Sequence, residues 1–193
     1  MSDATTRAFI AISLTRQLHD ELSILQDKLK QSNADVKWSE PENIHLTLKF
    51  LGNITDEQIK NVVLSLKKIS SGFNAFSVHL AQVGAFPKTS YPRVIWVGMD
   101  EGAETVKRLN QSIENELEAL GLRKETREFS CHLTLGRVRS VKNKQGLTNI
   151  IEKEKDFTSA YRVLIEDIIL FKSTLTKKGP IYEPIFKGSL IKT

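Results

Sequence analysis

Cysteine is nearly absent from this 193-residue sequence, which contains only Cys131. A single cysteine excludes an intramolecular disulfide and fits the reducing cytoplasm. The sequence also lacks any apolar run close to the roughly 20 residues that a membrane-spanning helix needs. Residues 8–12 are apolar, but no small-residue cleavage signal follows them, so they predict a strand and not a signal peptide. We therefore expect a cytoplasmic protein that is not embedded in a membrane.

Histidine is scarce as well, and two of the four histidines occupy the same local sequence. The string His-Leu-Thr-Leu occurs at residues 45–48 and again at residues 132–135, so the two copies begin 87 positions apart. A chain that carries the same His/Thr pair once in each half has the components of a two-histidine acid/base site.

Composition and charge add only broad limits. The chain is 40% hydrophobic and 26% charged, as is usual for a globular protein, and its formal net charge is +5. An excess of positive charge mildly favours a polyanionic partner such as nucleic acid. There is no low-complexity segment, no evident linker and no clear oligomerisation signal. We expect one domain over residues 1–193 and no obligate protein partner.

Periodicity predicts alternating strands and helices. Apolar residues at helical spacing predict helices over about 16–31 and 103–120, a capping box at 55–58 begins another helix, and a short helix is expected over 146–155. Strands are expected at 7–14, 36–38, 43–51, 76–83, 93–99, 132–138, 161–164, 166–174 and 181–186, with Gly52-Asn53 ending the third and a turn over 86–92.

This order predicts an α+β fold made of two similar halves packed together. Strands that are separated by helices in this pattern favour antiparallel or mixed sheets over a strictly parallel sheet. If a pseudo-twofold axis relates the halves, the two His/Thr pairs can face each other across a cleft.

The motifs themselves predict one imidazole and one hydroxyl on the same face of each strand. Residues two apart in a strand point the same way, so His45 lies beside Thr47 and His132 beside Thr134, while the leucines face a core. Strict alternation also places Phe50 with the leucines and Lys49 with the histidine.

Two facing histidines suit a reaction in which one end loses a proton and the other gains one. Near neutral pH, a neutral ring can take a proton from a nucleophile, while a protonated ring gives one to a leaving group. The hydroxyls of Thr47 and Thr134 can donate hydrogen bonds to the oxygens of a phosphate held between them. Neither a metal nor another cofactor is needed.

Simpler interpretations apply to each residue alone. A lone His-x-Thr is usually just the polar face of a strand, but identical pairs at corresponding positions are less easily a packing accident. A two-histidine metal site lacks flanking ligands at suitable spacing. Cys131 points away from His132 and fits a buried structural thiol, while His19 and His79 fit solvated and surface positions.

The chain resembles the 2H phosphoesterase superfamily, which is named for two His-x-Thr-x motifs. It is most similar to the RNA 2′,3′-cyclic phosphodiesterase branch, historically called 2′-5′ RNA ligases. The similarity covers nearly the whole chain, in order, through residues 7–12, Trp38, residues 42–52, Phe86-Pro87, residues 92–98 and residues 129–137. One departure is Cys131, because the family commonly has proline before the second histidine.

The resemblance implies a bilobal fold with the motifs facing across a central cleft. It also implies metal-independent opening of a terminal RNA 2′,3′-cyclic phosphate to a 2′-phosphomonoester. In that reaction His45 is the proton donor to the leaving 3′-oxygen, His132 is the proton acceptor that activates water, and Thr47 and Thr134 hold the phosphate. An arginine five residues after the second histidine, here Arg137, belongs to the family pattern.

The fifth residue after each motif histidine differs between the two halves of the chain. Strict alternation turns Arg137 away from His132, as a solvent-facing arginine, unless a bulge or bend at Gly136 re-aims it to clamp the phosphate. The first half has Phe50 there, which could contact a base or ribose or could belong to the core.

Two other functions use the same residues. The site could catalyse 2′-5′ RNA ligation in the reverse direction. Alternatively, the protein could bind RNA ends without converting them, although intact motifs argue against a degenerate site.

Overall fold

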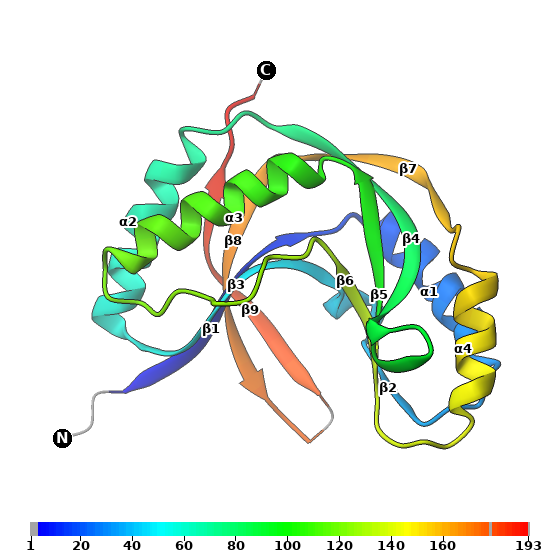
Figure 1. Ribbon diagram of the computed structural model, residues 1–193. Coiled ribbons are helices and arrows are strands. Elements are labelled where there is room, and N and C mark those ends of the chain that lie inside the picture. Colours follow the sequence, from blue (N-terminus) through cyan, green and yellow to red (C-terminus); the bar gives the residue numbers. More distant parts are fainter. Residues whose placement is uncertain (1–3, 178, 193) are drawn as a thin grey trace.

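In the computed structural model, which describes residues 4–177 and 179–192, the chain forms one curved sheet flanked by helices (Figure 1). Within the described residues the sheet has nine strands, and the pairings between the named strands are antiparallel. The strands are β1 (Thr5–Ser13), β2 (Val36–Trp38), β3 (His45–Thr55), β4 (Phe76–Lys88), β5 (Tyr91–Glu101), β6 (Leu133–Val138), β7 (Thr158–Ile165), β8 (Asp167–Leu175) and β9 (Pro180–Ser189).

The strand order β7-β4-β5-β6-β3-β1-β8-β9 places both motif strands at the centre. We call β3, β1, β8 and β9 the His45 lobe, and β6, β5, β4 and β7, with β2 on the edge of β6, the His132 lobe. A single residue pair, Leu46 with Leu133, joins β3 to β6. The α+β fold with two related halves is thus confirmed, and its sheet is antiparallel and continuous.

The lobes are not simply the two halves of the sequence. β4 comes from the first half of the chain but pairs in the His132 lobe, and the C-terminal β8 and β9 pair in the His45 lobe. Each lobe therefore contains strands from both halves of the chain, so neither lobe is one continuous segment.

The helices cover the sheet in pairs, one pair for each lobe (Figure 1). α2 (Asp56–Ser70) and α3 (Ala103–Glu118) pack on the His45 lobe, and α1 (Arg16–Lys30) and α4 (Lys144–Lys153) pack on the His132 lobe. A short 3-10 helix, η1 (Pro41–Asn43), precedes β3. The predicted capping box is present, since Thr55 and Gln58 exchange hydrogen bonds at the start of α2. Among the described residues, no helix combines the length and apolarity needed to cross a membrane.

Two expected strand ends were wrong. β3 continues through Gly52 to Thr55, because Gly52 adopts φ of +71°, a left-handed conformation that costs glycine little, and still pairs with Ala8. The expected turn over residues 86–92 is shorter, since β4 and β5 extend as a hairpin to within two residues of each other. Both differences lengthen strands beyond what local turn residues suggest.

Candidate active site

The two His-Leu-Thr-Leu motifs meet at the centre of the sheet and run in opposite directions. Their antiparallel register about the Leu46–Leu133 pair places His45 nearest Thr134 and Thr47 nearest His132. Both paired leucines are buried in the core, so alternation directs the histidines and threonines to the opposite face. Diagonal neighbours on one face of such a pair lie roughly 7–8 Å apart. The structure thus brings together the four residues that the sequence paired.

Each histidine ring is held by the same local hydrogen bond. Nδ1 of His45 donates to the carbonyl oxygen of Asn43 at 2.7 Å, and Nδ1 of His132 donates to that of Ser130 at 2.8 Å. A carbonyl can only accept, so Nδ1 carries the hydrogen and the neutral ring has its lone pair on Nε2. Neither Nε2 has a hydrogen-bond partner in residues 4–177 and 179–192, which leaves both free for proton transfer.

Burial lowers the pKa of both imidazoles, against the opposing effect of their carbonyl partners. The positive charge of Arg137 lowers the pKa of His132 further. Both rings therefore favour the neutral form near pH 7. An anionic phosphate between them would favour protonation of one ring.

A bulge in β6 redirects the residues that follow Thr134. Thr134 and Gly136 pair with two adjacent residues of β5. Leu135, which lies between them, is therefore an extra residue in β6. An extra residue resets the alternation of side chains, and Arg137 consequently faces the same side as Thr134. The arginine is exposed, and its charge acts on His132. A bulge at this point is what the sequence required for Arg137 to reach the cleft.

An equivalent bulge occurs in β3, where the sequence analysis did not predict one. Thr47 and Lys49 pair with two adjacent residues of β1. Leu48, which lies between them, is therefore an extra residue in β3. The expected strict alternation is therefore wrong beyond Leu48: Lys49 is buried, whereas Phe50 is 66% exposed on the cleft side opposite Phe9. Phe50 is not a core residue, and the residue five positions after each histidine faces the cleft.

Aromatic side chains contact both histidines, and the sequence did not predict these contacts. Phe9 stacks on His45 with ring centroids 4.8 Å apart, and Tyr182 meets the same ring edge-on at 5.2 Å. Phe86 meets His132 edge-on at 5.0 Å. Phe9 and Phe86 lie in segments that carried the family resemblance, but nothing in the local sequence associates Tyr182 with a histidine 137 positions earlier.

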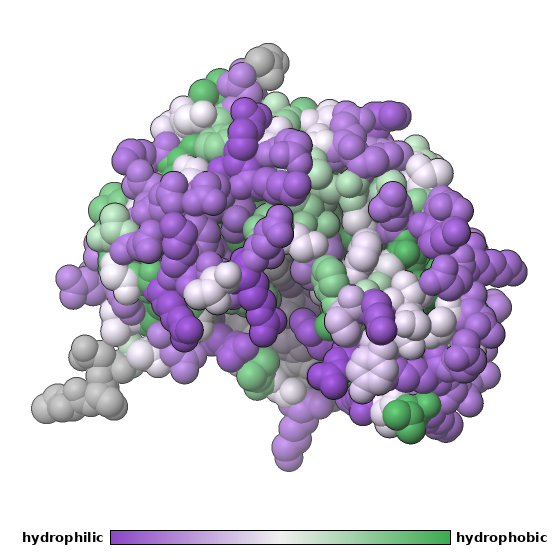
Figure 2. Space-filling view, viewed as in Figure 1, coloured by the Kyte–Doolittle hydropathy of each residue, from purple (hydrophilic) through white to green (hydrophobic). Residues whose placement is uncertain are grey.

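A cavity of about 250 Å³ adjoins the His45 side of the site. Figure 2 shows the molecule hollowed between its two lobes, with hydrophilic side chains around the opening. The cavity combines cations with aromatic rings, and its lining includes Arg7, Phe9, Lys37, Phe50 and Tyr182. Lys37 pairs directly with Arg137 across β2 and β6, which brings a further cation to this edge. Among the described residues, Arg7, Lys37 and Arg137 form no ion pair, so their charge is available to an anion.

The other two histidines lie outside this cluster. His79 is buried and not at the surface as expected, because its ring bonds both Asp100 and the carbonyl of Ser159, which raise its pKa. His19 is half-buried, and its Nε2 donates to the carbonyl of Ile44 at 3.2 Å. Each ring bonds a backbone carbonyl, and neither ring is part of the cleft cluster.

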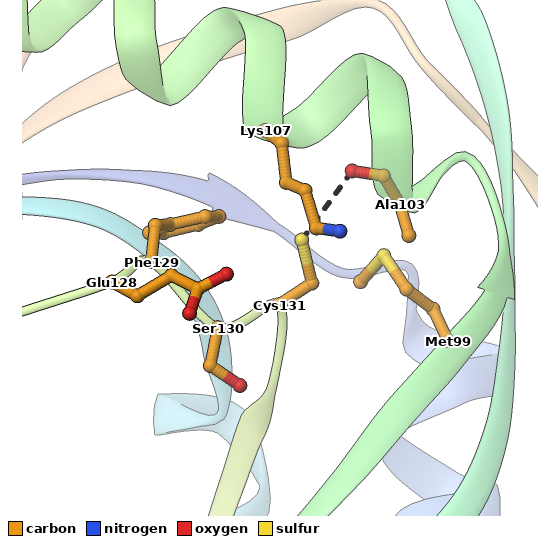
Figure 3. A pocket seen from close by; sticks show the side chains of 7 residues that line it. All are labelled: Met99, Ala103, Lys107, Glu128, Phe129, Ser130 and Cys131. Carbon is orange, nitrogen blue, oxygen red and sulfur yellow. Dashed lines mark hydrogen bonds between the residues drawn. The ribbon is translucent and has the colours of Figure 1, made fainter.

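Cys131 faces a separate cavity of about 390 Å³ beside α3 (Figure 3). Its thiol donates to the carbonyl of Ala103 at 3.5 Å, and burial raises its pKa to about 11. A thiol with so high a pKa is a poor nucleophile at neutral pH. This geometry agrees with a structural thiol. Among the described residues, no group of three or more His, Cys, Asp or Glu side chains is arranged to hold a metal ion.

Comparison with known proteins yields one consistent family. A sequence model described as "LigT like Phosphoesterase" matches the chain twice, over residues 12–96 and 97–182. Two similar proteins, each named RNA 2′,3′-cyclic phosphodiesterase, come from Methanothermobacter thermautotrophicus and Methanocaldococcus jannaschii. They are 35% and 36% identical, over 91% and 93% of this chain and 94% and 98% of their own.

Solved structures share the fold. A protein of Thermus thermophilus superposes with a TM-score of 0.79 at 24% identity, over 95% of this chain and 97% of that one. E. coli LigT, in a complex with 3′-AMP, gives a TM-score of 0.78 at 21% identity, over 96% of this chain and 98% of its own. At these identities the likeness concerns the fold alone.

Proposed function

The chain belongs to the LigT-like phosphoesterase family, and we propose that it hydrolyses RNA 2′,3′-cyclic phosphate ends to 2′-phosphomonoesters. The observation that carries this proposal is the antiparallel meeting of two His/Thr pairs on one face of the sheet. The names of the similar proteins support the choice of substrate. The proposed substrate is therefore RNA that ends in a 2′,3′-cyclic phosphate.

The proposed reaction uses the two unpartnered Nε2 atoms. Neutral His132 takes a proton from water as the water oxygen bonds to phosphorus, and protonated His45 gives its proton to the 3′-oxygen as the P–O3′ bond breaks. The products are a 2′-phosphomonoester and a 3′-hydroxyl. Thr47 and Thr134 donate hydrogen bonds to the non-bridging oxygens, and Arg137 balances their negative charge.

The surroundings of the two rings support this assignment of roles. Arg137 lowers the pKa of His132 beyond the effect of burial, which favours the neutral ring that a general base needs. Among the described residues no such cation lowers the pKa of His45, whose ring neighbours include Phe9 and Tyr182. An anionic substrate beside His45 would favour the protonated ring that a general acid needs.

The cavity next to His45 could hold the part of the RNA that adjoins the cyclic phosphate. Phe50 offers an exposed ring for stacking a base or ribose, and Arg7 and Lys37 offer unpaired cations for a phosphodiester. We propose that residues 1–193 work as one bilobal domain in the cytoplasm, in keeping with the single cysteine.

The test uses a short RNA with a 2′,3′-cyclic phosphate, incubated with the protein in EDTA and in water enriched in oxygen-18. We expect a 2′-phosphomonoester that carries one heavy oxygen, detected by mass spectrometry and ³¹P NMR. Absence of product would refute the function, and loss of activity only with chelator would refute the metal-independent mechanism. A parallel reaction with a 5′-hydroxyl RNA detects ligation, and binding without conversion would indicate an RNA-end binding protein.

A further inference from the structure

The bulged leucine at the end of each motif accepts a hydrogen bond from a buried side-chain amide of a helix. Gln26 of α1 is 1% exposed, and its Nε2 donates to the carbonyl oxygen of the bulged residue Leu135 at 2.8 Å. Asn110 of α3 is 7% exposed, and its Nδ2 donates to the carbonyl oxygen of the bulged residue Leu48 at 2.9 Å. The two lobes therefore use the same device at the same place.

The two helices that supply these amides are counterparts in the repeat. α1 follows β1, which pairs with β3, and α3 follows β5, which pairs with β6. Each amide crosses to the motif of the other strand pair: Gln26 reaches β6, and Asn110 reaches β3. Because the same contact occurs in both lobes, it is not an accident of how one helix packs.

We propose that Gln26 and Asn110 are positioning residues, which set the direction of Arg137 and Phe50 by stabilising the bulges before them. The proposal rests on the proposed function for its readout. Removing the amide takes one hydrogen-bond donor from each of these buried carbonyls, which destabilises the bulged conformation. A regular strand without the extra residue would turn Arg137 or Phe50 to the core face. The amides favour the bulged register and thereby keep the fifth residue in the cleft.

The two contacts differ in one respect, which predicts unequal effects. Gln26 Nε2 also donates to the carbonyl of Ser39 at 2.8 Å, and the backbone N–H of Ser39 donates to the carbonyl of Leu135. Gln26 thus ties the end of β2 to the bulge of β6, whereas Asn110 holds a single strand. We expect the loss of Gln26 to have the larger effect.

The experiment measures kcat/KM for hydrolysis of the cyclic-phosphate RNA in double-mutant cycles. Each amide variant is combined with each variant of the fifth residue. The variants are Gln26→Met and Asn110→Leu, each alone and combined with Arg137→Ala or Phe50→Ala. We expect Gln26→Met to lower kcat/KM by roughly tenfold alone and to add little to Arg137→Ala, as coupled residues do. With Phe50→Ala its effect should multiply. Asn110→Leu should show the reverse pattern, coupled to Phe50 and independent of Arg137.

Multiplicative effects in all four combinations would overturn the proposal, because a general loss of stability does not distinguish Arg137 from Phe50. Urea unfolding of each variant measures that loss separately. If Gln26→Met does not fold, Gln26→Asn keeps a buried amide but withdraws it from both carbonyls, and the same coupling to Arg137 is expected. If the RNA is not hydrolysed, the proposed function fails. The cycles then use calorimetric affinity for adenosine 2′-monophosphate, where absence of the same coupling would refute the positioning roles.

Discussion

The two His-Leu-Thr-Leu motifs are alike through their bulged leucines and differ at the next two positions. Lys49 and Phe50 follow the first motif, and Gly136 and Arg137 follow the second. The local backbone is alike in both, since the leucine after each motif threonine is an extra residue and each fifth residue faces the cleft. The comparison shows that a repeated backbone device can present an apolar ring on one side of a site and a cation on the other.

The fourth residue after each motif histidine packs differently in the two lobes. Lys49 is 4% exposed, and its ammonium group lies 2.6 Å from the carboxylate of Glu114 and 3.0 Å from the carbonyl of Arg123. Gly136 instead lets β2 approach, because a Cβ there would lie 2.7 Å from Cγ1 of Val36. At this position the His45 lobe has a buried ion pair, whereas the His132 lobe has a glycine against which side chains of β2 pack closely.

Removing either histidine should have the largest effect, and a sulfur leaving group should separate their roles. We expect His45→Ala and His132→Ala each to lower kcat by roughly 10²–10⁴-fold, the usual contribution of general acid–base catalysis, with circular dichroism unchanged. A substrate with sulfur in place of the 3′-oxygen needs no proton on its leaving group. It should therefore restore activity to His45→Ala and not to His132→Ala, and the opposite pattern would reverse the assignment.

The fourth position should matter for stability more in the His45 lobe. Lys49→Met leaves the Glu114 carboxylate buried without its cation and should lower the free energy of unfolding by about 3–5 kcal/mol. Gly136→Ala crowds Val36 and should cost about 1–3 kcal/mol. Urea denaturation measures both. The exposed pair of Lys68 and Glu116 provides the control, since Lys68→Met should change stability by less than about 1 kcal/mol.

The fifth position should separate binding of the phosphate from binding of the nucleoside. Arg137→Ala should lower kcat/KM by roughly 10²–10³-fold, because it removes a charge that faces the reacting phosphate. Phe50→Ala should act mainly on KM, by roughly ten-fold, the effect of losing one stacked base. Steady-state kinetics on the same RNA compares them. A KM effect from Arg137→Ala with unchanged kcat would show that Arg137 binds substrate and transition state equally.

The pH dependence of kcat/KM should show the smallest difference between the Arg137 and Phe50 variants. His132 must be neutral to act as the base, and its lowered pKa places the acid limb of kcat/KM below the ordinary imidazole value of 6.5. Arg137→Ala removes one cause of the lowered pKa and should move the acid limb to higher pH. Phe50→Ala should leave the acid limb in place, and a shift in that variant would contradict the assignment to His132.

Local patterns predicted much of the fold because they depend on neighbouring residues. Leucines at helical spacing defined the buried face of α1, and Thr55 with Gln58 defined the start of α2. The exchange of strands between lobes was not predictable in this way. The pairing of β4 with β5 and of β8 with β1 depends on which apolar faces find each other in the folded chain.

The sequence by itself determined which residues recur: two copies of a His/Thr pair, with one arginine after the second copy, predict acid/base catalysis on a phosphate. Only the tertiary structure decided where Arg137 and Phe50 point. Alternation along a strand is a local rule, but each bulge that breaks it bonds a buried amide from far along the chain, 109 positions from Leu135 and 62 from Leu48. Contacts at that separation exist only once the helices have packed on the sheet.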